Sequence, residues 1–130
     1  MFIRLFYGVV RQLCKLIGLS FSFSGDGEDV IIMKYLCRIK NGNYIDIGSH
    51  QPTQHSNTFL FYLTGWKGIC IDPLPSLKIK YRIIRGRDAF INAGIIGSKF
   101  KTENKLNFFY YKKHRDNSTF DPARVKELSD

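Results

Sequence analysis

Short apolar runs alternate with segments of helical spacing through the middle of the chain. The runs at 44–47, 68–71 and 89–93 have the length of buried strands and are bounded by glycine, proline or polar residues. Between them, residues 56–64 and 73–84 carry apolar side chains at helical spacing. Strands and helices that alternate with short turns predict right-handed crossovers and a parallel sheet. The predicted fold class is therefore α/β, the first half of a doubly wound sandwich with three layers.

The N-terminal segment, residues 1–20, is predicted to form an amphipathic helix. Arg4, Arg11 and Lys15 fall on one face, and bulky apolar residues cover the remainder. These charges interrupt every apolar run well short of the ~20 residues that a membrane span requires. Two interpretations stay open: the helix packs on its own domain, or it lies on an anionic membrane surface. We therefore divide the chain into an N-terminal helix, 1–22, and a partial doubly wound domain, 23–130.

Three further elements are predicted from local signals. Asp26 is placed to cap a helix that continues to about Arg38, because aspartate is a favoured N-cap residue. Residues 106–111 alternate enough to form a fourth strand, expected to be antiparallel. Residues 117–130 are predicted to be a loop followed by the start of a helix.

The numbers and positions of the cysteines and histidines indicate which disulfides and metal sites the chain could form. The three cysteines, Cys14, Cys37 and Cys70, are odd in number and widely spaced, which indicates neither a disulfide framework nor a zinc site. A reducing, cytoplasmic location is the simplest expectation, with membrane association as the alternative. His50 and His55 lie in one polar loop, but no third ligand is evident, so we predict no metal site.

The chain is basic, with a formal net charge of +9. Such a charge favours anionic partners. Apart from Tyr81, the densest basic cluster lacks the interleaved aromatic residues typical of single-strand binding, so no nucleic-acid partner is expected. Its helical spacing predicts a solvated face made of Lys78, Lys80, Arg82, Arg85 and Arg87.

The ends of the first two strands hold the candidate chemistry. The first strand contains Asp46 and turns away through Gly48, where the backbone can approach a ligand closely. The second ends at Asp72, which lies 24 residues beyond Gly48, near the offset of about 20 expected for a ribose-binding carboxylate. Two structural alternatives stay open: Asp46 as a satisfied buried acid, and Asp72 as a turn residue or helix cap.

The first turn indicates which nucleotide-type cofactor is favoured. Residues 46–58 contain a single glycine, so neither the glycine-rich dinucleotide fingerprint nor the phosphate-binding loop is present. A nucleoside cofactor without a pyrophosphate fits this turn better, and S-adenosylmethionine is such a cofactor.

Several segments, in this order, resemble the FkbM-type S-adenosylmethionine-dependent methyltransferases. They are 27–29 (GED), 46–52 (DIGSHQP), 56–58 (SNT), 65–73 (GWKGICIDP), 85–88 (RGRD) and 91–94 (INAG). Gly86 stands where that family often has proline. The resemblance covers residues 27–120 and implies a Rossmann-like fold of the class I methyltransferase type. It also implies transfer of a methyl group to a hydroxyl of a sugar or another small metabolite.

The resemblance assigns roles to individual residues. Asp72 would bind the ribose of S-adenosylmethionine. The remaining cofactor contacts would be Asp46, Gly48 and Ser49 at the first turn, Asp88, Asn92 and Ala93 at the adenine, and Gly27, Glu28 and Asn57 at the methionine end. For two of these a structural alternative is equally open, Asp88 as a turn residue and Asn57 as a helix cap.

Members of this family continue beyond the equivalent of Asp130, so the resemblance implies a sheet truncated after its first half. The acceptor wall and the catalytic base would lie in the other half, and the catalytic residues are therefore unknown. The alternatives to an enzyme are an inert cofactor-binding remnant and a basic adaptor for a membrane or another anionic partner. An unpaired edge of a central strand would also favour self-association.

Overall fold

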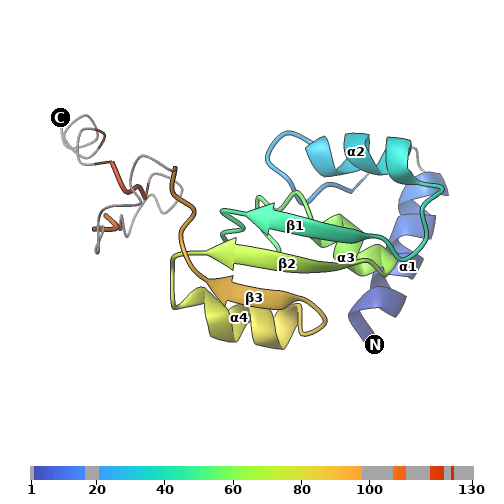
Figure 1. The fold of residues 1–130 in the computed structure, drawn as a ribbon. Coiled ribbons are helices and arrows are strands. Elements are labelled where there is room, and N and C mark those ends of the chain that lie inside the picture. The colour runs from blue at the N-terminus through green and yellow to red at the C-terminus, as the bar shows by residue number, and fades with distance from the viewer. Residues whose placement is uncertain (1, 17–20, 98–106, 111–117, 122–123, 125–130) are drawn as a thin grey trace. The chain divides into compact units, whose positions relative to one another are not determined.

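The computed structural model describes residues 2–16, 21–97, 107–110, 118–121 and 124. Contacts divide the chain into two units, Met1–Gly94 and Ile95–Asp130. All the helices and strands with assigned bounds lie in the first unit (Figure 1). They are α1 (Phe2–Leu16), α2 (Glu28–Leu36), β1 (Asn43–Ile47), α3 (Phe59–Thr64), β2 (Lys67–Asp72), α4 (Leu77–Ile84) and β3 (Ala89–Asn92).

The three strands form one parallel sheet in the order β1-β2-β3. Figure 1 shows the three arrows pointing the same way, with a helix in each crossover. Ile45 lies opposite Ile69, and Ile71 lies opposite Ile91. The predicted α/β class and the parallel sheet are confirmed.

Helices α3 and α4 cover one face of the sheet, and α1 and α2 pack on α3. On that face Cys70 is fully buried, and the ring of Tyr81 in α4 stacks on Phe90 of β3 at 4.8 Å. The opposite face carries exposed isoleucines, namely Ile45, Ile47, Ile69 and Ile91. Within the described part of the unit there are thus two layers, and the third layer of the predicted sandwich is not among them.

The apolar core forms around α3. Phe59, Tyr62 and Leu63 pack together, and Phe23 meets Phe59 edge-on at 4.9 Å. Tyr7 of α1 also packs on this cluster, so α1 is attached to its own domain by one side. No helix in the described ranges is long and apolar enough to cross a membrane.

The beginning of α2 differs from the prediction. Gly27, at a φ of 84°, is the N-cap residue, and its carbonyl accepts the first backbone bonds of the helix from Val30 and Ile31. Asp26 is exposed and does not cap. The buried carboxylate is that of Asp29, which accepts bonds from Ser22, Ser24 and the backbone N–H of Phe23 and Val30. Asp29, the aspartate whose hydrogen bonds fix the beginning of α2, therefore lies inside the first turn of the helix.

The second unit contains little regular structure among its described residues. Phe109 and Thr119 form a single antiparallel bridge, and the rings of Phe108 and Phe120 lie 4.8 Å apart. The predicted strand at 106–111 is reduced to this bridge, and its two end residues lie outside the described ranges. The helix predicted after residue 117 also lies almost entirely outside them.

Gly68→Ala should destabilise the first unit. A Cβ at this position would lie 1.8 Å from the ring of Tyr44, which the hydrogen bonds of its hydroxyl hold in place. Overpacking of this kind costs about 1–3 kcal/mol of unfolding free energy. Urea unfolding followed by the fluorescence of Trp66 measures the loss.

Gly8→Ala is the matched control. A Cβ on Gly8 in α1 would meet no atom within 4 Å, so this variant should be as stable as the unsubstituted chain or more stable. Equal unfolding midpoints for the two variants would contradict the contact between Gly68 and Tyr44.

Candidate functional site

The turn after β1 folds back onto the end of β2. The backbone N–H groups of Gly48 and Ser49 both donate to the carbonyl of Ile71, at 2.9 and 3.2 Å. Gly48 has a φ of 70°, a left-handed conformation that glycine adopts without strain. Gly48 is exposed, and nothing lies within 4 Å of the position of a Cβ there. The backbone of this turn is thus open to the outside, as the sequence predicted.

Asp72 connects the ends of the three strands. Its Oδ2 accepts the N–H of His50 at 3.0 Å, and its Oδ1 accepts the N–H of Leu74 at 2.9 Å. Its backbone carbonyl accepts from Asn92 Nδ2 and from the N–H of Ala93. Asp72 is 5% exposed. The Asp72 side chain therefore stabilises the turn after β2, which is the structural alternative that the sequence left open. Since an ionised carboxylate has about four lone-pair sites, two acceptor positions remain on it.

Two buried polar atoms of the loop after β1 have no partner among the described residues. They are Ser49 Oγ and His50 Nε2. Ser49 is 3% exposed, and its carbonyl is fixed by a bond from the Tyr81 hydroxyl at 3.0 Å. Nearly all buried polar side-chain atoms in proteins are hydrogen-bonded, so a ligand or a water molecule is expected to satisfy these two.

The loop that carries these atoms is conformationally strained. His50 and His55 have φ values of 45° and 52°, in a region that residues other than glycine seldom adopt. Such conformations concentrate at ligand-binding and catalytic sites. The N–H of His50, whose backbone has this strained conformation, donates to the Asp72 carboxylate.

Of the other predicted cofactor contacts, Asp46 is bonded within the protein and Asn57 is exposed. The carboxylate of Asp46 faces the helix layer and accepts a short bond from the hydroxyl of Thr58, which fits the satisfied buried acid of the sequence alternatives. Asn57 is exposed. In the first turn of α3, the N–H of Phe59 donates to Ser56 Oγ and not to Asn57.

Asp88 lies away from the carboxyl edge. Its side chain is fully buried, and its Oδ1 accepts the N–H of Gly68 at 2.8 Å. Its Oδ2 accepts from the Tyr44 hydroxyl at 2.7 Å and from Arg85 Nε at 2.8 Å. Gly68 and Tyr44 belong to the beginnings of β2 and β1, so Asp88 is at the opposite end of the sheet from Asp72. The structure does not bring it together with Asn92 and Ala93.

Arg85 lies in the interior of the unit and not on the predicted basic face. The prediction of a solvated basic face is wrong at this position, because Arg85 is 0% exposed. Its guanidinium lies 5.2–5.6 Å from the ring centres of Tyr44, Tyr62 and Tyr81. It donates to Asp88 and to four further oxygens, those of Tyr44 Oη, Thr58 Oγ1, Ser56 Oγ and the Pro52 carbonyl.

Arg87 departs from the solvated face as well. Its guanidinium lies 4.1 Å from the ring centre of Tyr62 and donates to the Tyr62 carbonyl. Lys78 and Arg82 are exposed as predicted, and Lys80 donates to Gln51. The spacing of Arg85 and Asp88, three residues apart with opposite charge, was the signal in the sequence that could have identified the buried pair.

Burial keeps the hydroxyl and thiol groups around this arginine protonated. It raises the pKa of Tyr44 and of Tyr81 well above the usual value of a phenol. It also raises the pKa of the Cys70 thiol to about 12. At neutral pH these groups are therefore hydrogen-bond donors and neither bases nor nucleophiles.

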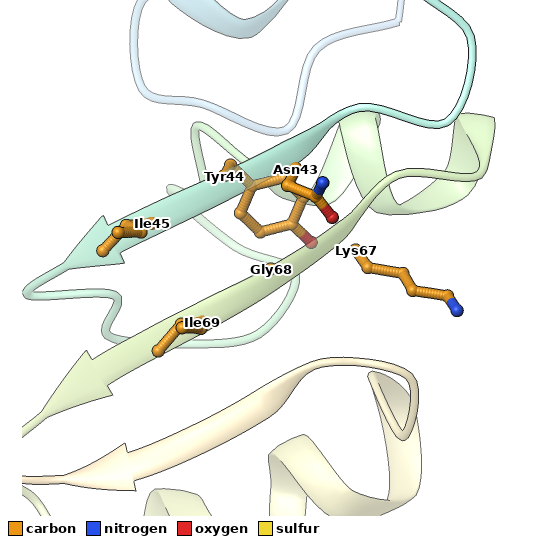
Figure 2. A pocket seen from close by; sticks show the side chains of 6 residues that line it. All are labelled: Asn43, Tyr44, Ile45, Lys67, Gly68 and Ile69. Carbon is orange, nitrogen blue, oxygen red and sulfur yellow. The ribbon is translucent and has the colours of Figure 1, made fainter.

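A hollow of about 480 Å³ lies at the other end of the strands from Asp72. It is lined by Asn43, Tyr44, Ile45, Lys67, Gly68 and Ile69, which belong to the beginnings of β1 and β2 (Figure 2). Apart from Lys67 and Asn43 its lining is apolar or backbone, and it holds none of the residues predicted to bind a cofactor.

The comparisons with known proteins add no relative. No family model matches the chain, and neither the search of curated proteins nor the search of solved structures finds a similar protein. Within the described residues, no group of three or more histidine, cysteine, aspartate or glutamate side chains could hold a metal ion. Functional inference therefore depends on the residues and their geometry.

Arg85→Ala should lower the free energy of unfolding by about 3–5 kcal/mol, because it leaves the buried Asp88 carboxylate without its cation. Denaturant unfolding measures the change. Arg82→Ala, one turn earlier on the exposed side of α4, is the control and should change stability by less than about 0.5 kcal/mol. If both substitutions had the same small effect, the pair of Arg85 and Asp88 would not be a main source of the stability of this unit.

Native thiol reactivity should separate Cys37 from Cys70. Cys37 is exposed, whereas Cys70 is buried and its raised pKa leaves almost no thiolate at mildly alkaline pH. Alkylation with iodoacetamide followed by mass spectrometry should modify Cys37 in the folded protein and Cys70 only in denaturant. Rapid modification of Cys70 in the native state would contradict this packing.

Proposed function

We propose that the carboxyl edge of the sheet binds S-adenosylmethionine and that the chain is the cofactor-binding part of a methyltransferase. The acceptor class that we propose is a hydroxyl of a sugar or another small metabolite. The observation that carries the proposal is the unpartnered, buried hydroxyl of Ser49, whose neighbour His50 donates its backbone N–H to the Asp72 carboxylate. The segment resemblance to FkbM-type methyltransferases supports the same assignment.

The residues at this edge fit a nucleoside with an amino-acid tail. Asp72 offers two free acceptor positions to ribose hydroxyls, and hydrogen bonds to a charged group contribute about 1.5–3 kcal/mol each. The Ser49 hydroxyl, buried and without a partner, would bond to the methionine end once the loop has shifted. Gly48 leaves the backbone approachable. Asn92 and Ala93, fixed to the Asp72 carbonyl, are the remaining residues placed to border the base.

Access to Asp72 involves the loop that contains His50. Because Asp72 is 5% exposed and holds the His50 N–H, a ribose reaches the carboxylate only when this segment shifts. The left-handed backbone of His50 stores conformational strain that such a shift would release. The loop would then close over the bound nucleoside.

Bound S-adenosylmethionine supplies an electrophilic methyl group on a sulfonium. The role of the protein in such a transfer is to hold the acceptor oxygen in line with that methyl group and to take up its proton. The edge residues named above bind and orient the cofactor. None of them is assigned as the base.

Isothermal titration of the full chain with S-adenosylmethionine tests the proposal. Ser49→Ala removes a hydroxyl with no partner in the described protein, so folding should be unchanged and the affinity should fall about two- to tenfold. Ser76→Ala is the matched control, because Ser76 is exposed and makes no side-chain cap bond. Its affinity should equal that of the unsubstituted chain.

Asp72→Ala should abolish detectable binding, and circular dichroism would show whether the sheet is retained. The absence of binding heat for the unsubstituted chain would refute the proposed function. Equal affinities of the Ser49→Ala and unsubstituted proteins would remove Ser49 from the site.

A further inference from the structure

Among the described side chains of α1, Tyr7 attaches the helix to the domain. Tyr7 packs on the cluster of Phe59, Tyr62 and Leu63, and its ring lies 6.2 Å from that of Phe23. Helices α1 and α3 are in direct contact. The orientation of α1 about its own axis is therefore fixed, and so is the face that it turns away from the domain.

The side of α1 away from Tyr7 is largely apolar and uncovered, with the exposed Gln12 as its polar member. Leu5, Phe6, Val9 and Leu16, which we call the α1 stripe, are 72%, 72%, 56% and 80% exposed. At ~100° per residue, Leu5, Val9 and Leu16 fall within about 40° of one another, and Tyr7 lies nearly opposite. Three large apolar side chains in one row, with Phe6 beside them, exceed the scattered exposure that is normal for a protein surface.

The charge of this part of the chain indicates what covers the stripe. Residues 1–25 contain Arg4, Arg11 and Lys15 and no acidic residue, since Asp26 is the first. A helix that combines bulky apolar residues with cations binds in the plane of an anionic bilayer, with its apolar side at the acyl boundary and its cations at the headgroups.

We propose that the α1 stripe docks the protein on the surface of an anionic membrane. The helix keeps Tyr7 on the domain and inserts Leu5, Phe6, Val9 and Leu16 among the lipids. This docking does not depend on the cofactor site, because the stripe contains none of the residues at the carboxyl edge.

Flotation of the full chain with two kinds of vesicle tests the proposal. Vesicles of phosphatidylcholine and phosphatidylserine should carry the protein upward, and vesicles of phosphatidylcholine alone should carry much less of it. The variant Leu5→Gln, Phe6→Gln, Val9→Gln should lower recovery with the mixed vesicles about tenfold or more, since it removes most of the inserted apolar area. Glutamine is a good helix former, so α1 is retained.

Ile79→Gln with Ile83→Gln is the matched control. These two isoleucines are 65% and 75% exposed on α4, which also carries exposed basic residues. Unchanged flotation of this control, with loss in the α1 variant, supports the proposal. Equal loss in both variants, no loss in the α1 variant, or equal recovery of the unsubstituted chain with both kinds of vesicle would overturn it.

A self-association interface is the competing explanation of the stripe. Sedimentation velocity without lipid distinguishes it. A lipid-free oligomer that the α1 substitutions convert to a monomer would overturn membrane docking, and a sedimentation profile that is unaffected by the substitutions supports it.

Discussion

The buried ion pair of Arg85 and Asp88 is the interaction on which the first unit depends. Both side chains are fully buried, and they join parts of the chain that are distant in sequence. Asp88 holds the beginnings of β1 and β2 through Tyr44 and Gly68. Arg85 holds the loop before α3 through the Pro52 carbonyl, Ser56 and Thr58. A buried pair of this kind is costly to break, since either partner alone would be an uncompensated charge.

This arrangement gives the two ends of the sheet different characters. At the beginnings of the strands the polar groups are satisfied, and burial keeps Tyr44 and Cys70 protonated. At the carboxyl ends, Ser49 and His50 keep buried polar atoms without partners, and the backbone is strained. The hydrogen bonds at the beginnings of the strands thus support the conformation of the loop at their carboxyl ends. This division agrees with the general rule that ligands bind at the carboxyl edge of parallel strands.

Periodicity was sufficient to predict the strands, the parallel sheet and the helices between them, because each element is short and bounded by glycine, proline or polar residues. The strand ends also drew attention to Gly48 and Asp72, and the resemblance added Asn92 and Ala93; the structure places Asn92 and Ala93 against the Asp72 carbonyl. Periodicity failed for Arg85 and Asp88, because helical spacing near a helix terminus does not reveal that an arginine turns inward to a carboxylate beyond the helix. The alternatives for Asp46 and Asp72 could not be decided without knowing which backbone groups face them.

The most direct test of the central claim is a two-dimensional ¹⁵N NMR titration of the chain with S-adenosylmethionine. We expect shifts confined to amides at the carboxyl edge. These are the amides of His50 and Leu74, which donate to the Asp72 carboxylate, and those of Gly48, Ser49 and Ala93, which donate to the backbone carbonyls of Ile71 and Asp72. The amide of Gly68, held by Asp88 at the other end of the strands, should not move. Shifts around Gly68 with none at His50, or no shifts at all, would contradict the account.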